Sequence, residues 1–245
     1  MGKPLEVFLR LEFLFMKAIK YLTPSQLEEL AKMQDTLNSM TCMGNFGHAD
    51  WRKEGWDWGL AIIDEVMEIH GHLGWKWWKG SDNYKQGINI DNKKQIQLEV
   101  IDILHFGLSK SMQAGQKFEP TPQLPPVWDL DDALSELLVN SEQTSFSWYA
   151  FDALCKALDL TASEIIDIYT GKYALNIFRQ DCGYGEGTYQ KQWLIPEISI
   201  KYQEDNWYLE KILGDIKRLG DKVTVSKVTC ELAKHYKLAT GGGSK

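Results

Sequence analysis

Two segments of the chain place acidic residues inside apolar helical stripes. Glu65 and Glu68 lie three residues apart, as do Glu99 and Asp102, so each pair projects from one face of its helix. An isolated pair at this spacing usually marks a solvated face, but here isoleucines lie one turn before and one turn after the first acid of each pair (Ile62 and Ile69, Ile96 and Ile103). Because burying unpaired carboxylates is expensive, we expect the two helices to gather four carboxylates that need either cations or raised pKa values to be tolerated there.

Helical periodicity also dominates the rest of the chain. The run Thr23-Pro24-Ser25-Gln26 combines an N-cap threonine, a proline at the first helical position and a glutamine at the third, so a helix is expected to begin there. Further helices are expected at 56–73, 94–107, 129–138, 151–157, 163–178, 207–218 and 223–236. Since clean period-2 alternation is scarce, the sequence predicts an all-α fold, a helical bundle.

One main domain suits a chain of 245 residues. It is expected to span 23–236, with a proline-rich connection near 117–126 that cannot be helix interior. Residues 1–22 are expected to form an N-terminal helical extension, and 237–245 a flexible tail. Charged residues interrupt the extension, which excludes a membrane span or a signal peptide (Glu6, Arg10, Glu12, Lys17 and Lys20).

Charge and cysteine usage narrow the function classes. The formal net charge of -7 argues against a protein that holds nucleic acid by its backbone, although a small anionic substrate could bind to local cations. The four cysteines form no CxxC pair and have no close histidine at metal-ligand spacing, so the sequence predicts neither a zinc site nor disulfides. A reducing cytoplasm fits this pattern.

Magnesium is the simplest partner for the acidic helices. No matching set of Arg or Lys is apparent on the two segments, whereas Mg²⁺ prefers oxygen ligands and leaves positions for phosphate and water. One carboxylate would then orient or deprotonate the attacking water. His70 and His72 follow the first acidic pair, but hard Mg²⁺ disfavours imidazole, so they are expected to be surface histidines at a helix end.

A long ordered set of motifs carries a family resemblance. The acidic pair is followed by Trp75-Lys76-Trp77-Trp78-Lys79, then by Glu99-Val100-Ile101-Asp102 running into His105-Phe106, and later by Gly171-Lys172 and Ala174-Leu175-Asn176-Ile177-Phe178-Arg179-Gln180-Asp181. In this order, from about residue 27 to about 193, the chain resembles the dimeric dUTPases of the all-α nucleotide pyrophosphatase superfamily. The resemblance implies Mg²⁺-dependent hydrolysis of dUTP, and of dUDP, to dUMP by a homodimer.

The resemblance also assigns roles to individual residues. It implies metal ligation by the four acids, with Glu65 positioning the catalytic water. It implies a phosphate-binding set composed of Lys172, Asn176, Arg179, Tyr184 and Lys191, and base contacts by Gln34 and Asn38. Apart from the resemblance, one ring of the tryptophan cluster, Trp78, is expected to stack on the base, with Lys79 near the phosphates. Glycines at 183, 185 and 187 would let the backbone approach a phosphate chain closely.

Simpler interpretations of these residues stay open. Lys172 and Arg179 would also suit an ordinary cationic end of a helix. Gln34 would also suit a hydrogen bond to a neighbouring helix, and the tryptophans would also suit a core.

Three other functions are compatible with the sequence. The same site would cleave dCTP as well as dUTP if a base-reading amide accepted both pyrimidine edges. The fold would also serve a catalytically silent nucleotide-binding regulator. A helical interaction protein whose tryptophans line a partner groove is a third alternative, and it leaves the motif spacing unexplained.

Overall fold

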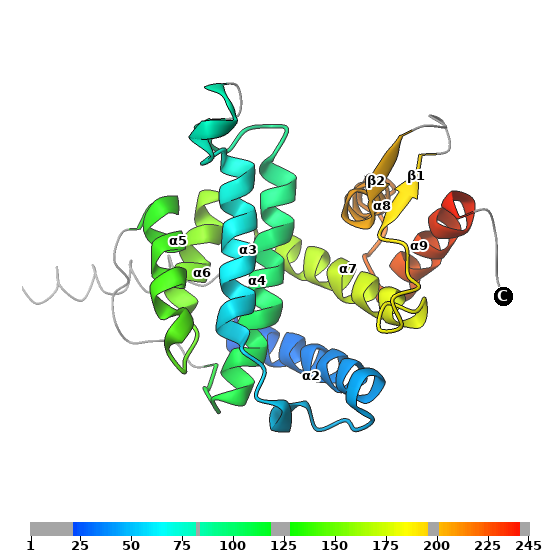
Figure 1. Ribbon diagram of the computed structural model, residues 1–245, viewed down its shortest axis with the longest axis horizontal. Coiled ribbons are helices and arrows are strands. Elements are labelled where there is room, and N and C mark those ends of the chain that lie inside the picture. The colour runs from blue at the N-terminus through cyan, green and yellow to red at the C-terminus, as the bar shows by residue number, and fades with distance from the viewer. Residues whose placement is uncertain (1–21, 82–83, 119–127, 196–200, 241–245) are drawn as a thin grey trace, which may run out of the picture.

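The computed structural model describes residues 22–81, 84–118, 128–195 and 201–240, and within them it is built almost wholly of helices (Figure 1). The elements, in chain order, are α2 (Pro24–Phe46), η1 (Trp51–Glu54), α3 (Trp58–Leu73), η2 (Trp77–Lys79), α4 (Lys93–Gln113), α5 (Leu130–Val139), η4 (Asn140–Glu142), α6 (Trp148–Ala157), α7 (Ala162–Asp181), β1 (Gln192–Leu194), β2 (Tyr202–Glu204), α8 (Asp205–Arg218) and α9 (Val225–Ala239). The all-α prediction is confirmed.

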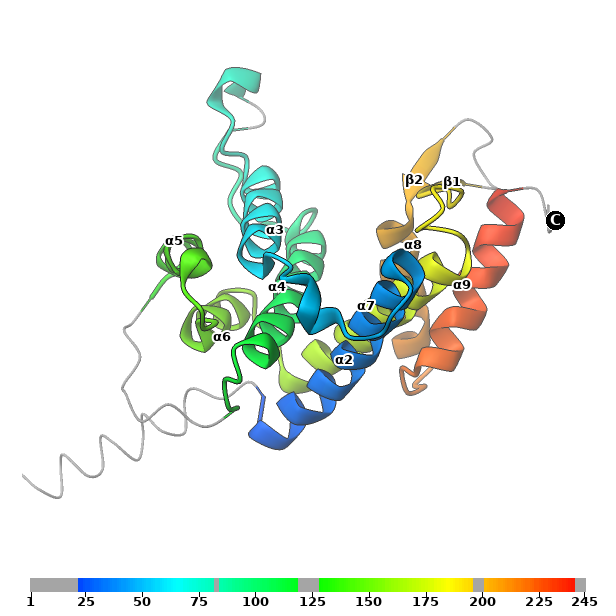
Figure 2. The same ribbon diagram turned by 60° about the horizontal axis from the view of Figure 1, so that its bottom comes forward.

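Helix α2 begins where its capping signal predicted. The Thr23 side chain accepts a hydrogen bond from the Gln26 backbone, and the Gln26 side chain accepts one from the Thr23 backbone in return. The helix ends at Gly47, whose φ of 77° is one that glycine adopts without strain. It lies along α7 and against α4 (Figure 2).

Helices α3 and α4 form the central antiparallel pair, with α5 and α6 on one side and α7 on the other (Figure 1). The Asp57 side chain caps α3 by accepting from the Leu60 backbone N–H. Helix α4 continues six residues past the predicted end at Gly107. A Cβ at that position would lie 2.7 Å from the ring of Phe146, so this glycine permits close packing and does not end the helix.

Two apolar cores meet at α7. The first fills the space among α2 to α7, and the second lies among the end of α7, the strands, α8 and α9. Tyr169 of α7 belongs to the first core and Leu175 to the second. The two strands pair antiparallel, with Trp193 opposite Gln203, and they were not predicted because three residues are too few for period-2 alternation to show.

The predicted chain ends fall largely outside the described residues. The N-terminal extension up to residue 22 and the proline-rich connection near 117–126 lie almost wholly there, as does most of the tail. Helix α9 continues to Ala239, so it includes the first three residues of the expected tail, which was predicted to start at 237. Among the helices described, none is both long enough and apolar enough to cross a membrane.

Candidate active site

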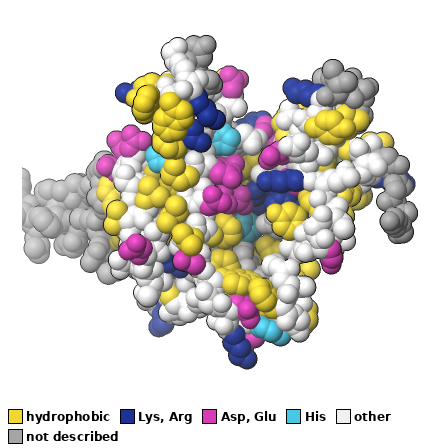
Figure 3. Space-filling view, viewed as in Figure 1, with side chains coloured by type: hydrophobic (Ala, Val, Ile, Leu, Met, Phe, Trp, Pro, Cys, Tyr) yellow, Lys and Arg dark blue, Asp and Glu magenta, His cyan; other side chains and the backbone are white. Residues whose placement is uncertain are grey.

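Three glutamates from the central helix pair converge on one point. One carboxylate oxygen each from Glu65 and Glu68 of α3 and from Glu99 of α4 lie within 4.8 Å of one another. Glu99 is buried and Glu68 is exposed, so the group opens to solvent on one side. The acidic patch over α3 and α4 faces a patch of cationic side chains on the side toward α7 and the strands (Figure 3).

The glutamates oppose one another's charge. Burial, followed by the charges of Asp102 and Glu99, raises the pKa of Glu65 to about 9, against the attraction of Lys172. Burial and Glu99 also raise the pKa of Glu68, which Lys191 partly offsets. Glu65 is therefore stable at neutral pH either with a proton or beside a cation.

Asp102, the fourth predicted ligand, is already paired. Its carboxylate contacts the ammonium of Lys172, which comes from α7 and is 1% exposed. Burial still raises the pKa of Asp102, although Lys172 acts to lower it. Lys172 also donates to Asn206 Oδ1 at 3.1 Å. No partner for Asp102 was apparent on the two acidic helices because this lysine comes from a helix 70 positions further along.

His72 lies beside the acidic cluster. Its Nε2 atom is 3.5 Å from Glu99 Oε1, and its side chain is one-third exposed. His72 lies in the last turn of α3, as expected of a histidine at a helix end, but its position beside Glu99 was not predicted. The reason is that the last turn of α3 is adjacent to the first turns of α4, an antiparallel contact that one-dimensional spacing does not reveal.

Arg179 is held by a buried network. Its Nε and Nη2 atoms donate to Asp205 at 2.8 and 2.7 Å, and its Nη1 donates to Asn176 Oδ1 at 3.1 Å. Tyr189 donates a further hydrogen bond to Asp205 at 2.8 Å, and Asp205 is fully buried. Burial opposes the guanidinium charge, but the hydrogen bonds and charge of Asp205 raise the pKa of Arg179.

Asp205 was missed by the sequence analysis. It is the first residue of α8, where an acidic residue is the usual complement of a helix dipole, and no motif distinguishes it. No motif distinguishes Asn206 either, although it accepts a hydrogen bond from Lys172.

The predicted phosphate-binding residues separate into two groups. Lys172, Asn176 and Arg179 share a face of α7, and the half-exposed Tyr184 and Lys191 follow in the next loop and at its end. Lys79 lies apart from them in η2, beyond the far end of α3 (Figure 1).

The glycines of the loop after α7 have a structural reason of their own. Gly183 has a φ of 88°, and a Cβ there would lie 2.0 Å from Thr188 Oγ1. Gly187 also has a positive φ, of 69°. The conformation of this loop therefore requires both glycines. Their presence does not by itself indicate a phosphate-binding loop.

The two predicted base-binding amides are joined in a buried network. Gln34 donates to Asn38 Oδ1 at 2.8 Å, and Asn38 donates to Ser109 Oγ at 2.9 Å. Tyr169 donates its hydroxyl proton to Gln34 Oε1 at 3.0 Å. The alternative reading of Gln34 as a link between helices is thus also satisfied.

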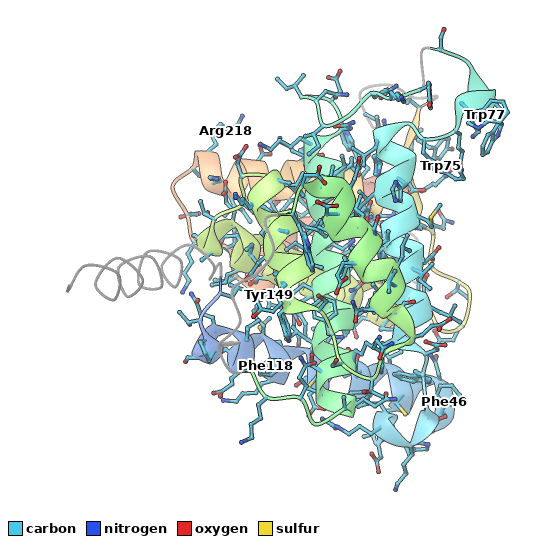
Figure 4. All side chains as sticks on the ribbon, turned by 90° about the vertical axis from the view of Figure 1, so that its left-hand side faces the viewer. Phe46, Trp75, Trp77, Phe118, Tyr149 and Arg218 are labelled. Atoms are coloured by element: carbon cyan, nitrogen blue, oxygen red, sulfur yellow. The ribbon has the colours of Figure 1, made fainter. Side chains whose placement is uncertain are left out.

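Trp78 is not brought to these amides. It packs edge-on against Trp75 and Trp77 at centroid distances of 5.1 and 5.6 Å, and more than half of it is exposed. Trp75 and Trp77 project from the tip beyond α3, at the opposite end from Phe46 (Figure 4). The expectation that tryptophans fill a core is wrong for this cluster.

His105 is a buried polar side chain that no motif assigned a role. It stacks on Tyr169 at 4.0 Å, and its Nδ1 lies 2.5 Å from Gln34 Oε1. Burial, with a smaller contribution from Lys172, lowers its pKa to about 3, so the ring is neutral. Because Nδ1 donates to Gln34, Nε2 is left as an acceptor, and it has no hydrogen-bond partner in the described part of the chain.

A separate cavity of about 620 Å³ lies between the second half of α2 and the loop after α7. None of the predicted site residues lines it. Its walls include Asp35, Asp181 and Glu186, whose charge would repel a polyphosphate. An anionic ligand with a divalent cation is better accommodated where the acidic and cationic groups face each other.

Comparison with known proteins identifies a family. A family model described as dUTPase matches residues 26–184, which is more than half of the chain. A search of curated proteins finds no match.

Proposed function

Because the chain belongs to the dUTPase family, we propose that it hydrolyses dUTP to dUMP and pyrophosphate, acts also on dUDP, requires Mg²⁺ and works as a homodimer. The observation that carries the proposal is the convergence of three glutamates from α3 and α4 opposite the cationic face of α7. Neither half alone would serve this reaction, since one suits a metal and the other a polyphosphate.

The donor set fits Mg²⁺. Glu65, Glu68 and Glu99 offer carboxylate oxygen within one small volume, and Asp102 is adjacent. Hard divalent cations prefer such ligands. Burial, followed by the charges of Asp102 and Glu99, raises the pKa of Glu65 to about 9, and a cation would offset both the lost hydration and the repulsion. When bound there, Mg²⁺ would supply electrostatic stabilisation of charge on the phosphate oxygens.

Each side chain then has a definable task. Glu65 accepts a hydrogen bond from water and takes its proton as the oxygen attacks phosphorus. The bond between the bridging oxygen and that phosphorus breaks, leaving dUMP and pyrophosphate. Lys172 and Arg179 hold phosphate oxygens, and Asp205 fixes the guanidinium in advance. Asn176, Tyr184, Lys191 and Lys79 complete the proposed phosphate set.

Base selection is proposed to depend on the buried polar network on α2 and α4. Gln34 and Asn38 retain unused donor and acceptor capacity for the uracil edge. The unpartnered Nε2 acceptor of His105 would accept from uracil N3–H and would oppose the lone pair at cytosine N3. Stacking by Trp78 stays a prediction, and it requires η2 to close on the base.

The test is pyrophosphate release from the full-length protein with a panel of deoxynucleoside triphosphates, with and without Mg²⁺, beside a Glu65→Gln variant. We expect release that is confined to dUTP, depends on the metal and is lost in the variant. Equal release from dCTP would favour the broader pyrimidine enzyme. Binding of dUTP with no release from any nucleotide would favour the silent nucleotide-binding protein.

A further inference from the structure

A second cluster of metal-ligand side chains lies in the segment that joins α2 to α3. Cys42 lies near the end of α2, His48 follows the Gly47 turn, and Glu54 closes η1. One potential ligand atom from each lies within 4.8 Å of the others.

The spacing of the sulfur and nitrogen atoms matches one metal ion. Cys42 Sγ lies 3.6 Å from His48 Nδ1. Thiolate and imidazole ligands at about 2.3 and 2.0 Å from a tetrahedral Zn²⁺ are about 3.5 Å apart. The pair therefore needs almost no movement to share an ion. The Glu54 carboxylate now lies 2.8 Å from the opposite ring nitrogen, His48 Nε2, and it would have to move toward the Nδ1 side to join them, within a group whose ligand atoms already lie within 4.8 Å of one another.

We propose that Cys42, His48 and Glu54 bind a divalent transition-metal ion of the Zn²⁺ class, with water at the remaining position. Sulfur, nitrogen and oxygen donors together select a borderline-soft cation, in contrast to the all-oxygen cluster on α3 and α4. Cys42 and His48 come together because the left-handed Gly47 turns the chain back over α2.

The local charges favour a cation. The carboxylates of Glu54 and Asp50 lie close enough to Cys42 for their negative charge to act on its sulfur. The neighbouring cations are engaged elsewhere, Arg52 with Asp35 at 2.9 Å and Lys53 with Asp50 at 2.8 Å.

The surroundings allow entry and hold the site in place. The His48 side chain is 45% exposed, so an ion can reach the site from solvent. Below it, Cys42 packs with Trp51 and Trp58, and Trp51 donates to Asp35 at 2.8 Å. A bound ion would clip the end of α2 to the segment that leads into α3, the helix that carries Glu65.

The probe is Co²⁺ added to the full-length protein in excess Mg²⁺, which keeps the acidic cluster occupied. Thiolate ligation gives a charge-transfer absorption that oxygen ligands do not give. We expect this band together with the visible bands of tetrahedral Co²⁺, both displaced by one equivalent of Zn²⁺. The absence of a thiolate band in the wild-type protein would overturn the proposal.

Variants locate the site. Cys42→Ser should abolish the thiolate band, whereas Cys230→Ser, at an exposed cysteine of α9, should leave it unchanged. His48→Gln and Glu54→Gln alter the more exposed ligands without disturbing the buried thiol, and each should weaken Co²⁺ binding at least tenfold. Unchanged binding in both would refute the site even if Cys42→Ser did not fold. None of these readouts depends on dUTP turnover, so the two proposals fail independently.

Discussion

The acidic face of α3 and α4 and the cationic face of α7 lie opposite each other, but they differ in how their charges are balanced. Glu65, Glu68 and Glu99 face one another, and their repulsion is met only in part by Lys172 and Lys191. Arg179, in contrast, has a bidentate partner in Asp205.

The difference indicates two ways of preparing a site. The acidic face stores repulsion that a divalent cation relieves, so its order and affinity depend on the ion. The cationic face is assembled by the fold itself and would meet a phosphate chain with little rearrangement. Lys172 links the two faces, since it comes from α7 and neutralises Asp102 of α4.

Removing one buried glutamate should have the largest effect. Glu99→Gln keeps the shape of the side chain but removes a charge from the cluster, so we expect dUTP turnover to fall by roughly a hundredfold or more. The matched control is Asp64→Asn, at an exposed acid of α3 that is not one of the three converging glutamates, and this variant should retain activity. Similar losses in both variants would show that general acidity, and not the cluster, matters.

Breaking the buried ion pair between Arg179 and Asp205 should destabilise the fold. Asp205→Asn removes the charge that Arg179 requires, and leaving a buried ion without its partner costs about 3–5 kcal/mol. Asp215→Asn breaks the exposed pair with Arg218 and should cost less than about 1 kcal/mol. Urea unfolding at neutral pH measures both, and equal costs would contradict the contrast.

Replacing Lys172 should affect the acidic face and the cationic face in opposite directions. In Lys172→Gln, Asp102 loses its internal cation, so Mg²⁺ should bind roughly tenfold more tightly in the absence of nucleotide. The same variant should turn over dUTP less efficiently because a phosphate donor is lost. Calorimetric titration and steady-state kinetics separate the two effects, and weaker metal binding would show that Lys172 does not compete for Asp102.

The acidic face should also make the metal-free protein sensitive to pH. Folding raises the pKa of Glu65 from 4.5 to about 9, so the folded state binds the proton more tightly than the unfolded chain. That contribution to stability is complete below about pH 4.5 and is lost as the pH rises through about 9. In EDTA, the free energy of unfolding should therefore fall between about pH 6 and pH 9.

A neutral isostere identifies the group responsible. Glu65→Gln, which has no proton to lose, should show a shallower decline over the same range. A decline as steep as that of the wild-type protein would assign the pH dependence to other groups.

Local signals in the sequence predicted much of the fold. The capping box at Thr23 and the apolar stripes of α3 and α4 act within a few turns, so helix positions could be read from residue spacing. The end of α4 was wrongly predicted at Gly107, because the packing partner that requires this glycine, Phe146, lies 39 positions away. Residues whose roles depend on such distant contacts, Asp205 and Lys172 among them, could be placed in their networks only from the folded chain.

The candidate sites show the same limit. The acidic pairs were recognisable because both members of each pair lie on one helix. The cluster of Cys42, His48 and Glu54 was not predicted, because it depends on a left-handed turn and a short helix that bring three separate segments together.

The most direct test of the account is the unfolding temperature of the metal-free protein with and without Mg²⁺, for the wild type and for Glu65→Gln. We predict that Mg²⁺ clearly raises the unfolding temperature of the wild type, because an ion that binds only the folded state stabilises it. The rise should be much smaller in the Glu65→Gln variant. No rise in the wild type, or an equal rise in both proteins, would contradict the claim that these glutamates form a metal site.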